Sequence, residues 1–229
     1  MPGTEAEKTS VSGNQDSAVD KVITAIKKGV RFGRYVPGQR LIENDLATTF
    51  QVSRGTVRDA LRRLEAEGLV HFERYRGASI RKMSRRDIAE LNQIRAVLEG
   101  YAAAQAARNG SEAQRASLLE LERYWATEKQ NLPEDYTTYN TAFHDLIVEM
   151  SGCRQLVHFI QQTNLSVFRL QFHVLLMVPQ RIAMARTEHR AIVEAILARN
   201  ECAANEAMRK HVDTSTQIIL SAPDEYFFE

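Results

Sequence analysis

Apolar side chains in the first third of the chain recur at helical spacing in three places. The first run begins near Val19, the second pairs Leu46 with Phe50, and the third occupies residues 57–64. Residues three and four positions apart share one face of an α-helix. Ser53 precedes the third run as a good N-cap, and a glycine follows it at the usual C′ position. We therefore predict helices after residue 18, over 42–50, and from about 53 to 67.

The spacing of apolar residues changes after this third helix from helical to alternating. Val70 and Phe72 alternate with polar residues, Gly77 permits a turn, and Ile80 resumes the apolar face. Two short alternating segments around a turn are typical of a β-hairpin. The order helix, helix, tight turn, helix, hairpin is that of a winged helix-turn-helix, which we expect to occupy residues 18–83.

Beyond residue 84 the apolar spacing is helical throughout. Helices are predicted over residues 87–108, 112–130, 134–151, 154–176, 180–199 and 201–220. Short links at Gly, Pro and Asn residues separate them. Amphipathic helices joined by short links favour an antiparallel bundle. The expected fold is mainly α, with an N-terminal winged helix-turn-helix and a C-terminal antiparallel six-helix bundle over residues 84–229. Residues 1–17 are polar and without periodicity, and we expect a disordered tail there.

Composition excludes several other classes of protein. With 44% hydrophobic and 26% charged residues, the chain resembles an ordinary soluble protein. Its longest apolar run, residues 174–178, is far shorter than the roughly 20 residues that span a membrane. Cys153 and Cys202 match no metal-ligand spacing. We expect both to be buried free thiols of a cytoplasmic protein.

Charge is distributed unevenly along the chain. Residues 18–82 contain 14 Lys and Arg against 7 Asp and Glu, whereas residues 83–229 contain 15 against 19. A basic head on an acidic body indicates that the head faces a polyanion. Charge by itself does not distinguish nucleic acid from an anionic membrane.

The third helix carries the candidate chemistry of this head. Arg54, Arg58 and Arg62 follow one another at four-residue intervals along one flank of its apolar stripe. A solvated flank paired with Asp59 and Glu65 is the alternative interpretation. The preceding tight turn, the basic head and the basic hairpin favour DNA, because an α-helix fits the major groove and Arg donates two hydrogen bonds to guanine.

These residues also resemble a known family. The stretches PGQRLIENDLA, VSRGTVRDALRRLEAEGLV and RYRGASIR are very similar to the signature of the GntR family of bacterial transcription regulators. The resemblance implies DNA contacts at residues matching the family pattern, which are Asn44, Ser53, Arg54, Thr56, Arg58 and Gly77. The pair Gly55-Thr56 departs from the Thr-Pro that many members carry.

Histidine spacing in the helical part raises the possibility of a metal site. His144 follows Asn140 by four residues, so both project from one helix face. His189 and His211 lie about equally far from the link near Asn200, so two successive antiparallel helices present them at one level. Imidazole nitrogen and amide oxygen suit zinc, nickel or manganese. Hydrogen-bonded histidines without a metal are the alternative interpretation.

A second resemblance covers this helical part. NQIRAVLEGYAAAQAA, NTAFHDLIVEMSGC and RTEHRAIVEAILARNECAANEAMRKHV are similar to the FCD effector domain of the FadR subfamily, in the six-helix branch of vanillate-responsive regulators. The resemblance implies a divalent metal held by Asn140, His144, His189 and His211. Asn140 stands where the family has Asp, so the site lacks one negative charge. Arg95 matches an effector-binding Arg, and an ion pair with Glu99 is the alternative.

The resulting hypothesis is a homodimeric transcription regulator rather than an enzyme. It would bind palindromic operator DNA, and a small carboxylate effector in the bundle would change the spacing or mobility of the DNA-binding heads. Two alternatives stay open. One is a metal-dependent enzyme with a DNA-binding appendage, and the other is a metal sensor without an organic effector.

Overall fold

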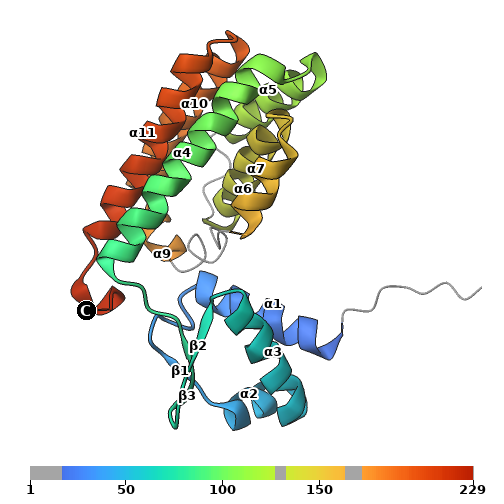
Figure 1. Ribbon diagram of the computed structural model, residues 1–229, viewed down its shortest axis with the longest axis vertical. Coiled ribbons are helices and arrows are strands. Elements are labelled where there is room, and N and C mark those ends of the chain that lie inside the picture. Colours follow the sequence, from blue (N-terminus) through green and yellow to red (C-terminus); the bar gives the residue numbers. More distant parts are fainter. Residues whose placement is uncertain (1–16, 127–132, 163–171, 229) are drawn as a thin grey trace, which may run out of the picture.

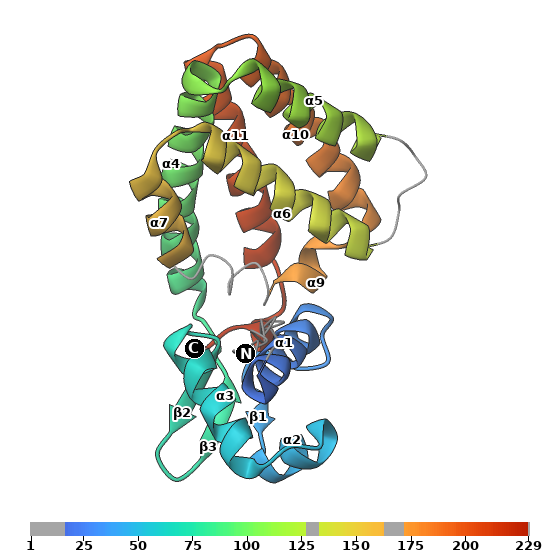
Figure 2. The same ribbon diagram turned by 90° about the vertical axis from the view of Figure 1, so that its right-hand side faces the viewer.

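A computed structural model describes residues 17–126, 133–162 and 172–228 of the 229-residue chain. The N-terminal elements form a head, and long helices stand above it as a bundle (Figures 1 and 2). The head contains α1 (Ala18–Arg31), β1 (Arg40–Leu41), α2 (Glu43–Phe50), α3 (Arg54–Ala66), β2 (Val70–Glu73) and β3 (Gly77–Ile80). This is the predicted winged helix-turn-helix, with one element more than the sequence indicated.

The additional element is β1. The three strands form an antiparallel sheet in the order β1-β3-β2, in which Leu41 pairs with Ala78 and Val70 pairs with Ile80. A two-residue strand is too short to leave an alternating pattern in the sequence, so only the hairpin was predictable.

Local signals define both ends of α3. The Ser53 hydroxyl accepts a hydrogen bond from the Thr56 backbone N–H at 3.1 Å. At the other end Gly68 adopts a φ of 79°, and the Leu69 N–H donates to the Leu64 carbonyl at 2.9 Å, as in a Schellman motif. The buried face of the helix, containing Val57, Ala60, Leu61 and Leu64, packs in the core of the head.

The bundle follows as a succession of helices. They are α4 (Arg85–Asn109), α5 (Glu112–Ala126), α6 (Pro133–Met150), α7 (Arg154–Gln162), α9 (His173–Leu176), α10 (Pro179–Leu197) and α11 (Glu201–Leu220). The mainly α fold class is confirmed. Within the described ranges, no helix has the length and apolar character that crossing a bilayer requires.

Small residues allow α4 and α11 to approach each other closely. Ala96, Ala103 and Ala107 of α4 belong to the same buried core as Met208 and Val212 of α11. A Cβ atom on Gly100 would lie only 2.7 Å from the Arg209 side chain. This close contact sets the spacing between the polar side chains that the two helices carry into the bundle.

The predicted continuous helix over residues 154–176 is wrong. Phe172 lies in a turn, and the helix that follows it, α9, has only four residues. Its ring is fully buried with Ile88, Ile219 and Phe227. Burial of this ring in a small core at the base of the bundle overrides the local helical pattern. Parts of the predictions for 1–17, 112–130 and 154–176 fall outside the described residues.

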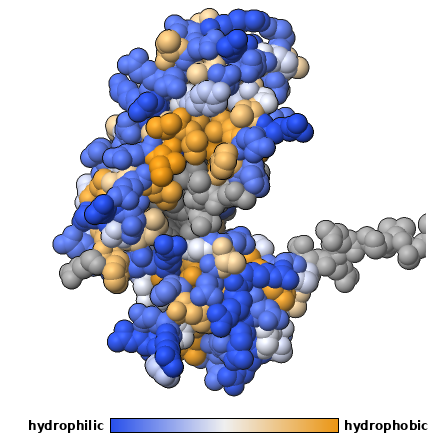
Figure 3. Space-filling model, viewed as in Figure 1, coloured by the Kyte–Doolittle hydropathy of each residue, from blue (hydrophilic) through white to orange (hydrophobic). Residues whose placement is uncertain are grey.

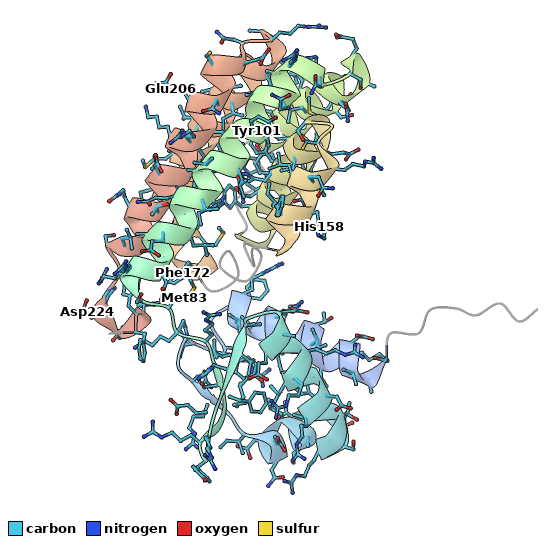
Figure 4. The ribbon with its side chains drawn as sticks, in the orientation of Figure 1. Met83, Tyr101, His158, Phe172, Glu206 and Asp224 are labelled. Carbon is cyan, nitrogen blue, oxygen red and sulfur yellow. The ribbon has the colours of Figure 1, made fainter. Side chains whose placement is uncertain are left out.

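The C-terminal segment lies across the junction between head and bundle, where Met83, Phe172 and Asp224 gather in Figure 4. The Arg85 guanidinium donates to the Ala222 carbonyl and to Asp224, both at 2.7 Å, and lies 3.9 Å from the Phe227 ring centroid. The end of α11 is thereby connected directly to the start of α4.

Both cysteines are free, but the expected burial of the pair is wrong. Cys153 is half-buried and Cys202 is exposed. Cys202 is the second residue of α11, in the first turn after the link to α10, where the helix still faces solvent.

Candidate nucleic-acid interface and metal centre

A groove of about 360 Å³ on the head brings the start of α2, the start of α3 and the hairpin together. Three of the predicted DNA-contact residues, Asn44, Arg54 and Gly77, line this groove, although each comes from a different element. Arg40 and Arg76 line it as well. Arg76 belongs to the basic hairpin that favoured DNA binding, and the structure adds Arg40, which the sequence did not single out.

Ser53 and Thr56 lie together at the N-terminus of α3. Their hydroxyl oxygens are 2.9 Å apart, and Ser53 also caps the helix. Backbone N–H groups and a partial positive charge at a helix N-terminus favour phosphate oxygens. The position suits the DNA contacts that the resemblance implies for both residues, and it favours a phosphate as the group contacted.

The three arginines on the flank of α3 have different surroundings. Arg54 faces the groove, and Arg58 forms a two-point ion pair with Glu43 of α2, with nitrogen–oxygen distances of 3.1 and 2.8 Å. Arg62 pairs with Glu65 at 2.9 Å and lies over the Phe72 ring. Arg62 therefore has the Glu65 partner that the alternative of a solvated flank expected, whereas the partner of Arg58 is an acid of α2 that the alternative did not name.

The hairpin tip is shaped for close approach. Gly77 has a φ of 81°, and no heavy atom lies within 4 Å of the position that a Cβ would take. The Arg40 Nε donates to the Arg76 carbonyl at 3.2 Å, which ties the tip to β1. A backbone left open in this way permits contact with a sugar-phosphate chain.

Three histidines converge inside the bundle, at the places predicted from their spacing. His144 of α6, His189 of α10 and His211 of α11 are all buried, and ring nitrogens of the three lie within 4.8 Å of one another. The Nε2 atoms of His189 and His211 are 3.3 Å apart. The expectation that these two helices present their histidines at one level is confirmed.

The other ring nitrogen of each histidine faces an outer oxygen. His144 Nδ1 lies 2.6 Å from Glu99, His211 Nδ1 lies 2.7 Å from Glu188, and His189 Nδ1 lies 3.2 Å from the Tyr139 hydroxyl. Such partners on Nδ1 orient an imidazole so that Nε2 serves as a ligand, and carboxylate partners raise its basicity.

Burial keeps two of these imidazoles neutral near pH 7. It lowers the pKa of His189 well below its usual value, and His211 and His144 nearby lower it further. Burial also lowers the pKa of His211, against the opposing effect of its hydrogen bond with Glu188. Neutral imidazole is the form that binds metals.

The donor set fits a divalent metal. Two nitrogen ligands, each about 2.1 Å from a tetrahedral zinc ion, are roughly 3.4 Å apart, close to the 3.3 Å between the facing Nε2 atoms. Asn140 precedes His144 by one turn, and its side-chain oxygen accepts a hydrogen bond from the Tyr136 hydroxyl at 3.3 Å. The fit rests on the three imidazoles rather than on Asn140.

Arg95 lies beside the cluster in a buried ion pair. Its Nε donates to Glu99 at 2.7 Å, and the two side chains are 4% and 1% exposed. The alternative derived from the sequence, a pair with Glu99 at i+4, is therefore present. Since Glu99 also contacts His144, Arg95 is connected to the histidines through this carboxylate.

Both halves of the chain match known families. Residues 18–80 match the model described as bacterial regulatory proteins, gntR family, and residues 90–214 match the FCD domain. The HTH-type transcriptional regulator YdhC of Bacillus subtilis is 32% identical over 193 residues, which cover 81% of this chain and 84% of YdhC. The chain belongs to the GntR family.

Further relatives agree with this assignment. The galactonate operon transcriptional repressor of Escherichia coli is 26% identical to this GntR-family chain over 86% of its length and 95% of the repressor. The crystal structure of a GntR-type regulator from Rhodococcus sp. RHA1 superimposes with a TM-score of 0.68 at 27% identity, covering 90% of this chain and 100% of the other. These relatives are transcription regulators, as expected, rather than enzymes.

Sequence reasoning missed a second buried arginine beside the histidine cluster of this GntR-family regulator. Arg181, in the first turn of α10, lies 2.9 Å from Glu188 and donates to the Ser215 hydroxyl at 2.8 Å. Glu188 follows Arg181 by seven residues, and Ser215 follows His211 by four. Each interval keeps two residues on one helix face, so these intervals were the available signal.

Proposed function

We propose that this GntR-family regulator binds palindromic operator DNA as a homodimer, under the control of a small organic acid bound at a divalent metal in the helical domain. The division at residues 83 and 84 separates the DNA-binding head from the effector domain, and the separate apolar cores of the two parts support it. We place the chain in the FadR branch on its motifs, and we expect it to work in the cytoplasm.

One observation carries the metal-dependent part of this proposal. Three buried imidazoles converge, and each has an oxygen partner on Nδ1. His144, His189 and His211 would hold the ion, with Asn140 as a neutral oxygen donor. Such an ion supplies a Lewis-acidic position for a carboxylate oxygen.

Charge balance favours an acid as the effector. The two ion pairs beside the histidines, Arg95–Glu99 and Arg181–Glu188, are each neutral overall. A dication among neutral imidazoles therefore introduces positive charge into a buried site, and an anionic ligand offsets it. Galactonate, in the name of one relative's operon, is a hydroxy acid of this kind.

An exposed apolar surface supports the homodimer. Ile94 and Val97 of α4 and Phe159 of α7 are 52%, 53% and 53% exposed, and Tyr101 continues the same face of α4. Figure 3 shows hydrophobic residues gathered over the middle of α4 and the adjoining α7, and Figure 4 shows Tyr101 and His158 on that side. We assign this α4–α7 surface to the contact between two copies, because contiguous exposed apolar patches mark interaction sites.

Val97→Glu is expected to weaken the dimer by about 10-fold or more, because it places a charge in an apolar contact whose partner does not compensate it. Sedimentation equilibrium of wild type and variant measures the change. Met184→Glu, at an exposed apolar residue of α10, is the matched control and should remain dimeric. If the Val97→Glu dimer has the wild-type dissociation constant, the α4–α7 surface is not the contact between the two copies.

Arg58→Ala is expected to cost about 1–3 kcal/mol in operator binding and to relax base preference at one position of each half-site. Arg58 lies on the flank of α3 that we orient towards the major groove. Sequencing of the duplexes that each protein selects from a random library measures the preference. An equal loss on selected and random DNA would instead identify Arg58 as a phosphate contact.

The proposed function is tested by measuring operator affinity with and without metal and acid. Protein prepared without a His tag is stripped with chelator, reloaded with zinc, and screened against carboxylic and hydroxy acids by thermal shift. An acid that stabilises only the zinc-loaded protein and changes affinity for the selected duplex supports the proposal. A change produced by zinc alone would favour a metal sensor, and steady consumption of the acid would favour an enzyme.

A further inference from the structure

An acidic side chain occupies the basic face of the head. Glu43 is the first residue of α2, and it lines the groove together with Arg40, Arg54 and Arg76. Its carboxylate binds the Nε and Nη2 atoms of Arg58 at 3.1 and 2.8 Å. The hydrogen bond with Arg58 lowers the pKa of Glu43, so this carboxylate is ionised at neutral pH.

A negative charge at this position opposes DNA binding in general. Phosphates repel it, and it cancels one of the positive charges that attract any duplex. Its contribution to folding is small, because side chains that are 56% and 22% exposed form a surface ion pair, which water and salt screen. Neither general affinity nor stability accounts for the placement of Glu43.

The geometry of the Glu43–Arg58 pair explains why an acid stands at position 43. Glu43 accepts hydrogen bonds from Nε and Nη2 on one edge of the Arg58 guanidinium. The Nη1 group is not bound by Glu43 and is left to donate to another acceptor. A free arginine side chain samples many rotamers, whereas a guanidinium held by a carboxylate presents its remaining donors in one direction. A mobile arginine reaches phosphates on any sequence, whereas a held one pairs well only where a guanine edge is aligned with it.

Arg54 provides the contrast within the same helix. It lies one turn earlier and faces the same groove. Its charge helps to lower the pKa of Glu43, but among the described residues it forms no ion pair comparable to the two-point pair of Arg58. Two arginines of one flank thus differ in their freedom to move. The more mobile Arg54 is suited to the phosphate backbone of DNA, and the held Arg58 is suited to a base edge.

We propose that Glu43 is a positioning residue that holds Arg58 for one base of the operator and suppresses its binding to phosphates of unrelated sequence. This inference rests on DNA reading by Arg58. It assigns sequence selectivity to a residue that does not itself need to touch a base.

The test compares four proteins on one random-sequence duplex library. Wild type, Arg58→Ala, Glu43→Gln and Asp45→Asn each select duplexes, which are sequenced, and affinity for the unselected library is measured over a range of salt. Asp45 is the matched control, because it is an exposed acid in the same first turn of α2. Its replacement removes the same charge without touching Arg58.

Glu43→Gln is expected to relax the same base position as Arg58→Ala. It should also bind the unselected library about fivefold more tightly at 0.15 M salt, the increase that close to one additional phosphate contact produces. Asp45→Asn should retain the wild-type base preferences. The combination of a relaxed position and increased general affinity distinguishes positioning from a simple change of charge.

Other outcomes would overturn the inference. If Glu43→Gln selects duplexes with the wild-type base preferences, Arg58 reads its base without being held by Glu43. Relaxation at a position different from that of Arg58→Ala would mean that Glu43 reads a base itself, as an acceptor from cytosine. Wild-type preferences in Arg58→Ala would instead remove the premise that Arg58 reads a base, so the two failures are distinguishable.

Discussion

His189→Phe is expected to abolish stoichiometric metal binding. Wild-type protein prepared without a His tag should contain about one divalent ion per chain by mass spectrometry, and the variant close to none. His189 is fully buried, and its Nε2 faces His211. Affinity should fall more than about 100-fold, since loss of even an outer partner of a metal ligand typically costs about 10- to 100-fold.

The replacement is chosen to preserve the fold. The His189 ring stacks on Phe143 with ring centroids 4.1 Å apart, so another flat ring of similar size fits the same space. His71→Ala, in the exposed part of the hairpin, is the control and should retain the ion. Metal retained in His189→Phe would mean that His144 and His211 hold it without their neighbour. No metal in the wild type, even after addition of zinc, would indicate a metal-free polar pocket.

Arg95→Met is expected to lower the free energy of unfolding by about 3–5 kcal/mol, because it leaves the carboxylate of Glu99 buried without its cation. Glu99 is 1% exposed, so solvent does not replace the lost partner. Urea unfolding followed by circular dichroism measures the change. Arg86→Met is the matched control on the same helix, and loss of its exposed pair with Glu90 should leave the free energy of unfolding almost unchanged.

A small loss in Arg95→Met, equal to that of the control, would contradict the structural role of this pair. If Arg95 also clamps the effector, the variant should lose the thermal shift produced by an acid that stabilises the wild type, while its duplex preferences remain unchanged. A variant that is destabilised but still responds to the acid would assign Arg95 to the structure of the bundle alone.

Much of the DNA-binding head was predictable from local signals. Ser53 caps α3 and Gly68 ends it, and both act on their immediate neighbours through backbone geometry. The hairpin around Gly77 follows from alternation and a turn. β1 was not predictable, because its two residues become a strand only by pairing with β3.

The convergence of the histidines was predictable for a related reason. His189 and His211 lie on consecutive helices joined by a short link. Because each helical residue advances the axis by the same rise, two residues equally far in sequence from the link lie at the same level of the bundle. The continuous helix through Phe172 was a false prediction, since the local pattern contained no sign that the ring would be buried in another core.

The sequence by itself determined most of the helices, their order and the residues that their faces present, because helical periodicity acts over a few positions. Only the tertiary structure decided the partners of those residues. Glu43 of α2 meets Arg58 of α3, and Glu99 of α4 meets His144 of α6. Such pairs depend on the distance and rotation between whole elements, which packing of the core sets and which no short stretch of sequence encodes.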